Sequence, residues 1–563
     1  MPEVSLQSLL HEAGIGGTIR EDTLVSNIVY DSRLCRPGDL FVALPGFHTD
    51  GHRYIPQAVR AGVHAVVHER PFDPAWLQDP EGAPVRATAD TGRSAAAGGE
   101  IRESAGAVSG APPVFVRVPD ARRALSALAD ALYGHPSREL CVIGVTGTDG
   151  KSTTVWFAYQ LLRALGVPAG FLSTVALETT GSVIDNPWRQ STPEAPEIHR
   201  SLREMADAGK RVAVVEATSH GLSEKTCRLA DVYFDVAVFT NLSHEHLEFH
   251  GSYEQYRSDK GNLFRSLRRA VAPGAGAEYG PAAVINGDDG ESDYYDSLAR
   301  DAGVARVLHY SIGATGADVS AFLSEMSPVS TTVLVDVAAD GVDGGDGGSP
   351  RRRATLPLPG WFNVSNALAA ALAVSESTGI PPGEVLGKIG ELTAVSGRLE
   401  PIESSAPFSV VVDYAHTPGS FEKVLPHFRE TTTGRLIAVF GSAGERDVDK
   451  RLRQGEVAGH YSEVLVLTDE DPRGEDRSVI IDTIASGAET ARNAVTGEPP
   501  EIHRVPDRRE AIRRAFDLAG AGDTVVLLGK GHEKSIIYRD GAIPWDEAKV
   551  ARKVLAEMGY APA

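Results

Sequence analysis

Cysteine is scarce in this chain of 563 residues. Cys35, Cys141 and Cys227 are the only three, and their spacing forms neither a CxxC metal pattern nor a disulfide framework. This usage is typical of a reducing compartment, and we expect the thiols to be packing residues. The sequence also lacks an apolar run of membrane-spanning length and an amino-terminal signal pattern. We therefore expect a cytoplasmic enzyme without membrane insertion.

Positive charge is in deficit as well. Lys and Arg total 55 against 76 Asp and Glu, so the formal net charge is -21. A nucleic-acid partner would require a basic face that displaces counterions, and this balance argues against one. Local basic pockets for phosphate groups remain compatible with it. The hydrophobic content of 42% is ordinary for a globular protein, and the length predicts three or four domains.

Short apolar runs predict an α/β fold. Because the runs are continuous rather than alternating, they indicate strands covered on both faces, as in a mostly parallel sheet. The predicted strands are 40–43, 64–67, 114–118, 140–145, 213–215, 236–239, 283–285, 410–412, 436–440, 464–467 and 525–528, with a helix over 121–133. A second set of apolar runs alternating with helical segments begins after Gly397, which predicts a Rossmann-like carboxyl-terminal unit. Two low-complexity segments, 87–113 and 338–353, are predicted to be surface insertions.

The most informative motif is VIGVTGTDGKSTT at residues 142–154, where an apolar strand leads into a glycine turn and a helix. Gly147 and Gly150 let backbone N–H groups approach phosphate oxygens, and the helix dipole favours the same anions. Lys151 can neutralise phosphate charge and Ser152 can ligate Mg²⁺. The motif predicts a nucleoside triphosphate site.

The motif departs from the strict phosphate-loop pattern, because Val145 stands where the first glycine belongs. We interpret it as a variant of the form TGTxGK[ST]. The plainer alternative is a glycine-rich turn with a surface lysine. A switch GTPase is disfavoured, since no guanine-reading NKxD occurs.

Polar clusters follow two further strands. Glu216, in VEATSHG, stands at a strand end where a Mg²⁺ ligand is well placed, although such a residue is often only solvated. FTNLSHEHLEFHG, at residues 239–251, is rich in histidine, but its spacing fits neither HExxH nor a Cys/His zinc framework. His246 is the candidate metal ligand near the phosphates, and His244 and His250 are interpreted as loop residues.

Three weaker motifs remain. Asp413 and His416 in DYAHTP follow a strand, and Asn363 and Asn366 open a helix, so each group can hydrogen-bond a base or ribose. Taken singly, each is more typical of a helix cap or turn. GKGHE at residues 529–533 lacks the third glycine of a dinucleotide fingerprint.

In this order the motifs resemble the Mur ligase family, the ATP-dependent ligases that build the peptidoglycan stem peptide in the bacterial cytoplasm. Within it they resemble the MurE type, which adds a diamino acid to UDP-N-acetylmuramoyl-L-alanyl-D-glutamate. The resemblance covers nearly the whole chain. It is carried by YDSR, GDLFVA, TGTDGKSTT, EATSHGL, FTNLSHEHLEFHG, DYAHTP, GERD, DEDPRGED and GKGHE.

The resemblance implies a three-domain architecture and a role for each matching residue. The domains would be a small α/β UDP-sugar-binding domain (1–137), a central mostly parallel-sheet ATPase domain (138–395) and a Rossmann-like amino-acid-binding domain (396–563). ATP contacts would be Gly147, Thr148, Asp149, Gly150, Lys151, Ser152, Thr153, Asn363, Asp413 and His416. UDP-muramoyl-dipeptide contacts would be Ser32, Ser191, Thr192, Ser219 and Arg228. Amino-acid contacts would be Arg446, Asp471, Arg473, Gly529 and Glu533.

The resemblance also implies the catalytic chemistry. Catalytic residues would be Lys151, Glu216, His246 and Lys260, and Mg²⁺ ligands would be Ser152, Glu216, His246 and Lys260. Lys260 falls where the family carries a carbamylated lysine, a carboxylate-like metal ligand. ATP would phosphorylate the D-glutamate carboxylate, and the diamino acid's amine would displace phosphate from the acyl phosphate. The partners are then small molecules only, and we expect a monomer.

The chain departs from the family patterns TGTNGKT and DNPR. The loop has Asp149 and Ser152, and the serine can still hold Mg²⁺; the run aligned with DNPR is Glu470-Asp-Pro-Arg473. Asp149 puts an acidic side chain beside the phosphates, which bears on nucleotide affinity rather than on fold. Asp471 replaces an asparagine, and an anion there favours the bare ammonium of lysine or ornithine over the carboxylate of meso-diaminopimelate. Arg473 suits that carboxylate through a bidentate pair, unless it pairs with Asp471 instead. We therefore expect lysine or ornithine slightly ahead of diaminopimelate.

Two competing interpretations are weaker. A folylpolyglutamate-synthase-like ligase would lack both the domain that carries residues 30–33 and the GKGHE motif. A non-catalytic nucleotide-binding scaffold would show no ATP turnover with the UDP-muramoyl dipeptide and any diamino acid.

Overall fold

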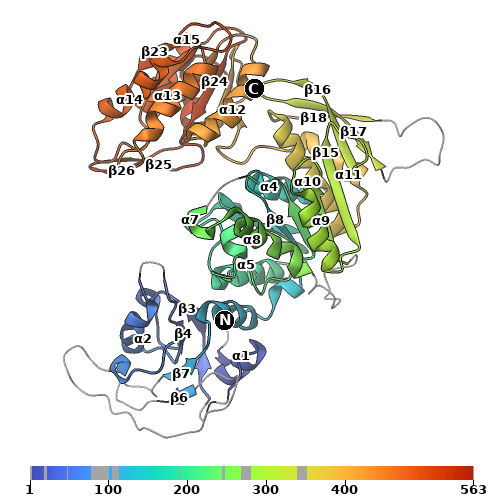
Figure 1. Ribbon diagram of the computed structural model, residues 1–563, viewed down its shortest axis with the longest axis vertical. Helices are drawn as coiled ribbons and strands as arrows, with labels where there is room; N and C mark the ends of the chain where they lie inside the picture. The colour runs from blue at the N-terminus through green and yellow to red at the C-terminus, as the bar shows by residue number, and fades with distance from the viewer. Residues whose placement is uncertain are drawn as a thin grey trace, which may run out of the picture.

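The computed structural model describes residues 3–17, 19, 22–46, 49–77, 101–103, 113–188, 190–243, 247–267, 280–338 and 351–561. Three α/β domains, each built on its own sheet, follow one another along the chain (Figure 1). In that view the amino-terminal domain lies at the bottom, the central domain in the middle and the carboxyl-terminal domain at the top. Within the described ranges, no helix is both long and apolar enough to cross a membrane.

The amino-terminal domain has a five-stranded sheet that is parallel except at one edge. In spatial order its strands are β3 (Asn27–Val29), β4 (Asp39–Val42), β5 (Ala65–His68), β7 (Val114–Arg117) and the antiparallel β6 (Ile101–Glu103). Helices α1 (Leu6–Glu12) and α3 (Ala121–Leu132) share one hydrophobic core with the sheet, and α2 (Ile55–Arg60) belongs to another. The sheet is therefore covered by helices on both faces.

The central domain has an eleven-stranded sheet whose middle is parallel. The strands, in spatial order, are β11 (Ile184–Asp185), β10 (Ala176–Glu178), β9 (Ala169–Leu172), β12 (Val212–Glu216), β8 (Cys141–Thr146), β13 (Val236–Phe239), β14 (Ala282–Asn286), β15 (Arg306–Ile312), β16 (Val319–Met326), β17 (Thr331–Val337) and β18 (Arg352–Leu356). From β9 to β16 all pairings are parallel, and the pairings outside that range are antiparallel.

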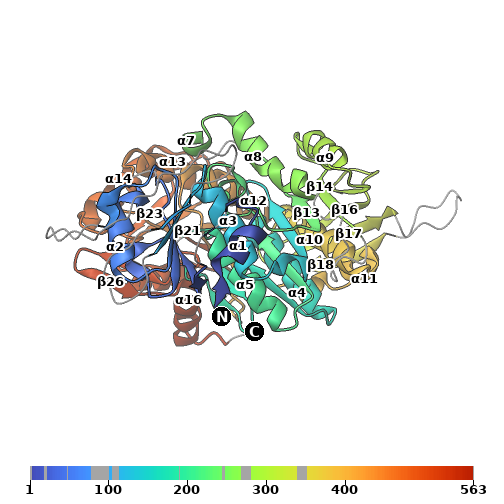
Figure 2. The ribbon, with the colours of Figure 1, turned by 90° about the horizontal axis from the view of Figure 1, so that it is seen from below.

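Helices cover both faces of this sheet. One core contains α4 (Lys151–Ala164), α10 (Trp361–Thr378) and α11 (Pro382–Leu386), and the other contains α5 (Ala195–Asp207), α8 (Tyr253–Ser266) and α9 (Ser292–Asp301). Figure 2 shows α9 and α11 on opposite sides of the sheet. Helix α10 is rich in alanine and almost wholly buried, so it packs closely along α4. This pairing ties the phosphate loop, where α4 begins, to the start of α10.

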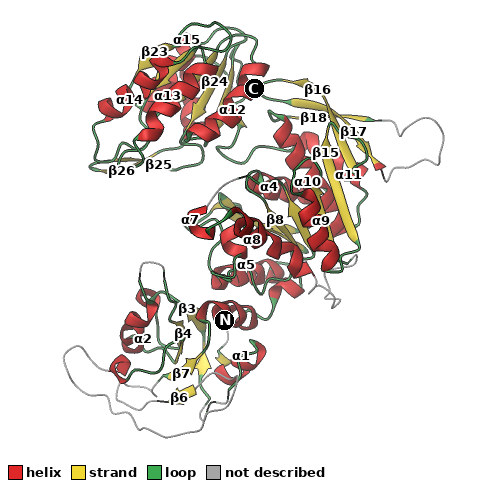
Figure 3. Ribbon diagram, viewed as in Figure 1, coloured by secondary structure: helices red, strands yellow, loops and turns green. Residues whose placement is uncertain are grey.

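The carboxyl-terminal domain is a doubly wound sheet with helices on both faces (Figure 3). Its strands, in spatial order, are β19 (Glu400–Pro401), β20 (Ser409–Asp413), β24 (Thr524–Leu528), β21 (Leu436–Phe440), β22 (Val464–Leu467) and β23 (Glu501–Arg504). Helices α12 (Pro418–Thr431), α13 (Asp449–Tyr461) and α14 (Arg477–Thr490) cover one face, and α15 (Arg508–Leu518) and α16 (Glu547–Glu557) the other. A two-stranded ribbon, β25 (Ser535–Tyr538) and β26 (Gly541–Pro544), follows β24.

The predicted α/β class and three-domain architecture are confirmed. Every predicted strand overlaps an observed one, because each apolar run lies between two helical layers. Two findings differ from the expectation that 87–113 and 338–353 are only insertions: β6 lies inside the first segment, and β18 begins inside the second. The antiparallel extension β16–β18 was also not predicted. Residues 87–100, 104–112, 244–246 and 339–350 lie outside the described residues.

Candidate active site

The phosphate loop after β8 requires its two glycines. Gly147 has φ +148°, and a Cβ there would lie 1.9 Å from Thr240 Oγ1. Gly150 has φ +83°, and its Cβ would lie 2.3 Å from Asn366 Oδ1. Side chains at either position would collide and also strain the backbone. The loop is thus packed against the end of β13 on one side and the start of α10 on the other.

Hydrogen bonds from the segment after β13 fix the loop backbone. Thr148 N donates to Asn241 O (2.7 Å), and Asp149 N donates to Asn241 Oδ1 (2.9 Å). Asp149 O accepts from Thr240 Oγ1 (2.7 Å) and Asn241 Nδ2 (3.0 Å). Lys151 Nζ donates to Thr148 O (2.6 Å), so this cation lies over the loop. Because α4 begins at Lys151, its positive dipole end points at the same place.

A buried carboxylate lies beside the loop. Glu216, at the end of β12, is 3% exposed, and its Oε2 accepts from Ser152 Oγ and Thr174 N, both at 2.8 Å. Glu216 Oε1 accepts from Thr174 Oγ1 (2.9 Å). A hydroxyl and a carboxylate at a helix start are the oxygen donors that Mg²⁺ prefers, so Ser152 and Glu216 fit this ion. Within the described ranges no group of three or more His, Cys, Asp and Glu could hold a metal, and His246 lies outside them.

Lys260 approaches the loop from helix α8. Its side chain is 2% exposed, and Nζ donates to Gly147 O (2.5 Å). Nζ also lies 4.5 Å from the ring centroid of Tyr256, whose hydroxyl contacts Thr148 Oγ1 (3.1 Å). The structure therefore brings Lys260 and Lys151 to the same turn from two different helices.

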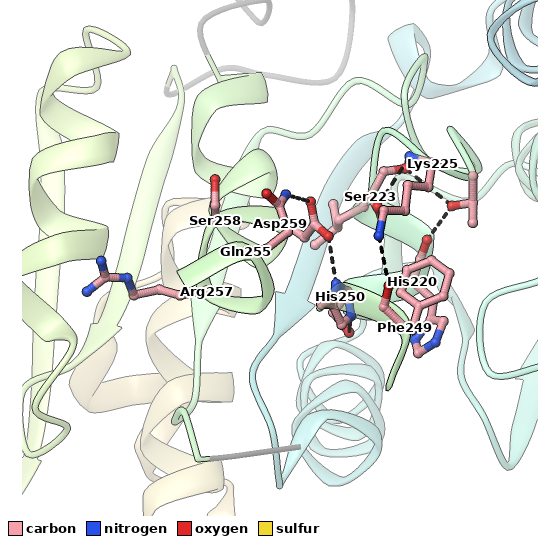
Figure 4. Close-up of polar contacts among 12 residues, drawn as sticks. His220, Ser223, Lys225, Phe249, His250, Gln255, Arg257, Ser258 and Asp259 are labelled. Atoms are coloured by element: carbon pink, nitrogen blue, oxygen red, sulfur yellow. Dashed lines mark hydrogen bonds and ion pairs between the residues drawn. The ribbon is translucent and has the colours of Figure 1, made fainter. Parts of the chain in front are cut away.

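His250 is a buried residue rather than the loop residue that we expected. It ends the short helix α7 (Leu247–His250), and its ring joins Asp259 Oδ2 (2.7 Å from Nδ1) to Ser219 Oγ (3.1 Å from Nε2). Gln255 Nε2 donates to the other Asp259 oxygen (2.9 Å), as Figure 4 shows. Asp259 immediately precedes Lys260, so this chain of contacts links the catalytic candidate to Ser219.

Two further candidate contacts of the UDP-muramoyl dipeptide, Thr192 and Arg228, lie next to Glu216. Thr192, 2% exposed, donates from Oγ1 to Glu216 O (3.2 Å) and contacts Thr218 Oγ1 (2.8 Å). Arg228 donates to Thr192 O (3.0 Å) and pairs with Glu194 (2.7 Å). Ser191, in contrast, is exposed.

Ser32 belongs to the amino-terminal domain and lies in a separate group. It is buried and its Oγ donates to Gln57 Oε1 (3.0 Å). The nearby Tyr30 reaches the central domain, where its hydroxyl donates to Glu197 Oε1 (3.1 Å). Burial, followed by the charge of Glu197, raises the pKa of Tyr30, so this phenol stays protonated and remains a donor.

The candidate nucleotide contacts come from two domains. Asn363 Nδ2 donates to Pro359 O (2.7 Å), and Asn366 Oδ1 accepts from Thr154 Oγ1 (3.3 Å) behind the loop. Asp413, at the end of β20, accepts from the backbone of Leu399 and Ala415, and burial raises its pKa. Burial lowers the pKa of His416, which makes the neutral imidazole the dominant form at neutral pH.

The candidate amino-acid contacts surround a buried lysine. Lys530 is fully buried, and its Nζ pairs with Asp471 Oδ1 (2.8 Å) and Glu533 Oε2 (2.6 Å). The alternative pairing of Asp471 with Arg473 is therefore not the one observed. Gly529 has φ +102°, and a Cβ there would lie 3.3 Å from Glu470 Oε2.

Two side-chain atoms on the segment that carries Asp471 are buried without a partner. Within the described part of the chain, Glu470 Oε2 and Arg473 Nε find no hydrogen-bond partner. Burial raises the pKa of Glu470 to about 7. Arg446, by contrast, is exposed. Unsatisfied buried polar atoms are costly unless a ligand pairs with them, so the two groups indicate a polar ligand site.

Sequence reasoning missed several residues of the site. Thr174, Thr240 and Asn241 hold Glu216 and the loop. Thr240 and Asn241 stood inside the recognised motif FTNLSHEHLEFHG, whereas Thr174 is a lone loop threonine that gives no signal. Glu470 and Lys530 stood inside motifs that were recognised, next to Asp471 and Gly529. Their position beside Asp471 and Gly529 was a usable signal, but the burial of Glu470 and Lys530 could not be inferred from the sequence.

The fold and this site define a three-domain ATP-dependent ligase with a variant phosphate loop. Three family domains match the chain: the Mur ligase family catalytic domain at residues 24–133, the middle domain at 145–374 and the glutamate ligase domain at 397–531. The chain belongs to the Mur ligase family, and within it to the MurE type.

Relatives support this assignment along the whole chain. A UDP-N-acetylmuramyl-tripeptide synthetase from Roseiflexus sp. (strain RS-1) is 45% identical and covers 95% of both chains. A UDP-N-acetylmuramoyl-L-alanyl-D-glutamate–2,6-diaminopimelate ligase from Caldanaerobacter subterraneus subsp. tengcongensis is 33% identical, with the same coverage of 95%. A solved structure of a protein with that ligase's name has a TM-score of 0.65 at 24% identity, covers 99% of this chain and 100% of its own, and shows the shared fold.

Proposed function

We propose that this ligase joins a diamino acid to the D-glutamate carboxylate of UDP-N-acetylmuramoyl-L-alanyl-D-glutamate, through an acyl phosphate. The observation that carries the proposal is the group formed by Ser152, Glu216 and Thr174 at the phosphate loop, beside Thr192 and Arg228. Ser152 meets the carboxylate of Glu216 and Thr192 meets its backbone carbonyl, so the phosphate-binding and dipeptide-binding candidates share one residue. The names of the relatives from Roseiflexus and Caldanaerobacter support the same reaction.

The proposed chemistry has two steps. A D-glutamate carboxylate oxygen attacks the γ-phosphorus of ATP, and the bond to ADP breaks. The amine of the diamino acid then attacks the acyl carbon, loses a proton, and phosphate leaves. Lys151 neutralises charge on the transferred group, and positioning supplies most of the catalysis. Mg²⁺, held by Ser152 and Glu216, would add positive charge at the phosphate oxygens.

We further propose that Lys260 acts as a carbamate. Its Nζ is buried at the phosphate loop beside Gly147 O, where an anionic group would add an oxygen ligand for Mg²⁺ to those of Ser152 and Glu216. Adding CO₂ to the neutral amine, with loss of a proton, converts it into an anion that suits the metal site. A Lys260→Ala variant assayed with and without short carboxylic acids tests this idea. Absence of any rescue would count against the carbamate.

For the added residue we keep a slight preference for lysine or ornithine over meso-diaminopimelate. Lys530 offsets the charge of Asp471, on which the preference first rested. Glu470 supplies another acidic group there, and its unpartnered oxygen suits an ammonium. Arg473 remains the group that suits the second carboxylate of diaminopimelate, and its Nε is without a partner as well.

A competition assay tests both levels of the proposal. Phosphate release is measured with ATP, the UDP-muramoyl dipeptide and equal amounts of lysine, ornithine and meso-diaminopimelate, and the products are identified by mass. We expect a basic diamino acid in the product. A clear preference for diaminopimelate would overturn the amino-acid preference alone. No turnover with any of the three would overturn the ligase reaction and favour a non-catalytic nucleotide-binding scaffold.

A further inference from the structure

The acidic side chain on the phosphate loop has a partner in another domain. Hydrogen bonds from Thr240 and Asn241 fix the backbone of Asp149. Its carboxylate extends away from the loop, and Oδ2 lies 2.6 Å from Lys423 Nζ. Lys423 belongs to helix α12 of the carboxyl-terminal domain. The two side chains are 58% and 59% exposed. Among the described residues, this is the only ion pair that joins the central domain to the carboxyl-terminal domain.

Helix α12 is also where the two domains meet through apolar groups. The His427 ring, one turn beyond Lys423, lies 5.6 Å from the ring of Phe362 at the start of α10. Val329, from the turn between β16 and β17, packs against the hydrophobic core that includes α12. Helix α12 is capped by Thr417, next to the candidate nucleotide contact His416. Helix α12 therefore contacts the phosphate loop and α10, and the hydrophobic core to which it belongs also contacts the β16–β17 turn.

We propose that Asp149 and Lys423 form a positioning pair that links phosphate binding to the docking of the carboxyl-terminal domain. The inference rests on the proposed function, because it assumes that ATP phosphates occupy the loop. With Lys423 in place, the charge on Asp149 is neutralised and the loop accepts phosphate. With Lys423 withdrawn, the bare carboxylate repels phosphate through space. The loop therefore binds ATP more tightly when α12 is docked.

This arrangement predicts an unusual relation between single and double variants. Lys423→Met should raise the KM for ATP about fivefold at low salt, because Asp149 is then uncompensated, and the increase should shrink as salt rises. Asp149→Asn should leave the KM for ATP unchanged or lower but reduce kcat about two- to fivefold, because docking is weaker. The double variant should recover a low KM for ATP, so the second change suppresses the first. Lys423→Arg should behave like the native chain.

The experiment combines direct ADP binding by calorimetry with ATP kinetics for these four variants at two salt concentrations. Lys388→Met is the matched control, because Lys388 is also a surface lysine in an ion pair, with Glu391. Equal KM values for Lys423→Met and the double variant would overturn the proposal, since Lys423 would then act on phosphate directly or not at all. If the native chain binds ADP but ligates no diamino acid, the proposed function fails, while the binding data still decide the pair.

Discussion

At the scale of single residues, close packing and burial determine how two positions of the site behave. Gly147 is the clearest case, because its backbone angle and the nearby Thr240 hydroxyl both exclude a side chain. Glu470 is the second, since it is an acid enclosed at 6% exposure in the carboxyl-terminal domain. Each has a measurable consequence.

Replacing Gly147 by alanine should remove nucleotide binding. The new Cβ would lie 1.9 Å from Thr240 Oγ1, so the loop must shift. We expect the kcat/KM for ATP to fall at least about a hundredfold, equivalent to about 2.7 kcal/mol. Gly166→Ala is the control, because Gly166 has φ +74° but nothing within 4 Å. It should cost about 1 kcal/mol of stability and leave ATP kinetics intact. Equal effects of the two changes would contradict this explanation.

Glu470 should make stability depend on pH. Burial raises its pKa from 4.5 to about 7, so the folded chain binds a proton there that the unfolded chain has released. Its contribution to stability is therefore present below about pH 4.5 and is lost as the pH rises through 7. The free energy of unfolding of Glu470→Gln, relative to that of the native chain, should therefore rise by about 3 kcal/mol from pH 5 to pH 8, as measured by denaturant unfolding. A constant difference across that range would show that the shift is absent.

At the scale of elements, the apolar runs were enough to predict the parallel strands, because a strand between two helical layers must be apolar along its length. Strands β16, β17 and β18 were not predicted, because only part of each is buried and their apolar runs are interrupted by polar residues. Strand order was also beyond sequence reasoning. The phosphate loop and Glu216 were predictable because each follows a strand directly, whereas Lys423 and Asp149 are 274 residues apart and meet only in the fold.

Helices α15 and α16 are held to the sheet by one buried ion pair. Arg508 and Glu547 are both fully buried, and the guanidinium also donates to Asp469 O (2.9 Å) and Leu528 O (2.8 Å) at the ends of β22 and β24. Arg508→Met leaves the buried Glu547 carboxylate without its charged partner, with only the Trp545 indole N–H still donating to it, and should cost about 3 to 5 kcal/mol. Arg509→Met, which breaks an exposed pair with Glu557, should cost less than about 1 kcal/mol. Similar thermal midpoints for the two variants would be evidence against this role.

At the scale of the whole molecule, three sheets with separate hydrophobic cores are joined by mostly polar contacts. The amino-terminal and central domains meet through Arg123 and Asp231 and through Tyr30 and Glu197. The central and carboxyl-terminal domains meet at α12. Such contacts allow the domains to unfold in separate steps.

Calorimetry of the whole chain should therefore show more than one unfolding transition, with nucleotide acting on one of them. A nucleotide at a hundred times its Kd adds about 2.7 kcal/mol to the domain that binds it, which corresponds to about 5 to 10 °C for a domain of this size. We expect the central-domain transition to rise by that amount while the amino-terminal transition stays in place. One transition that moves as a whole would indicate a single cooperative unit instead.

The close packing of α4 along α10 has a consequence for how such a ligase works through its cycle. The turn that would hold the phosphates leads into α4, and the candidate nucleotide contact Asn363 lies in the first turn of α10, while Asn366 lies behind the loop. The two helices are packed together as one unit. A bound nucleotide would then keep a fixed position relative to these two helices. The timing of the reaction would depend on when the amino-terminal and carboxyl-terminal domains bring their own substrates to the nucleotide.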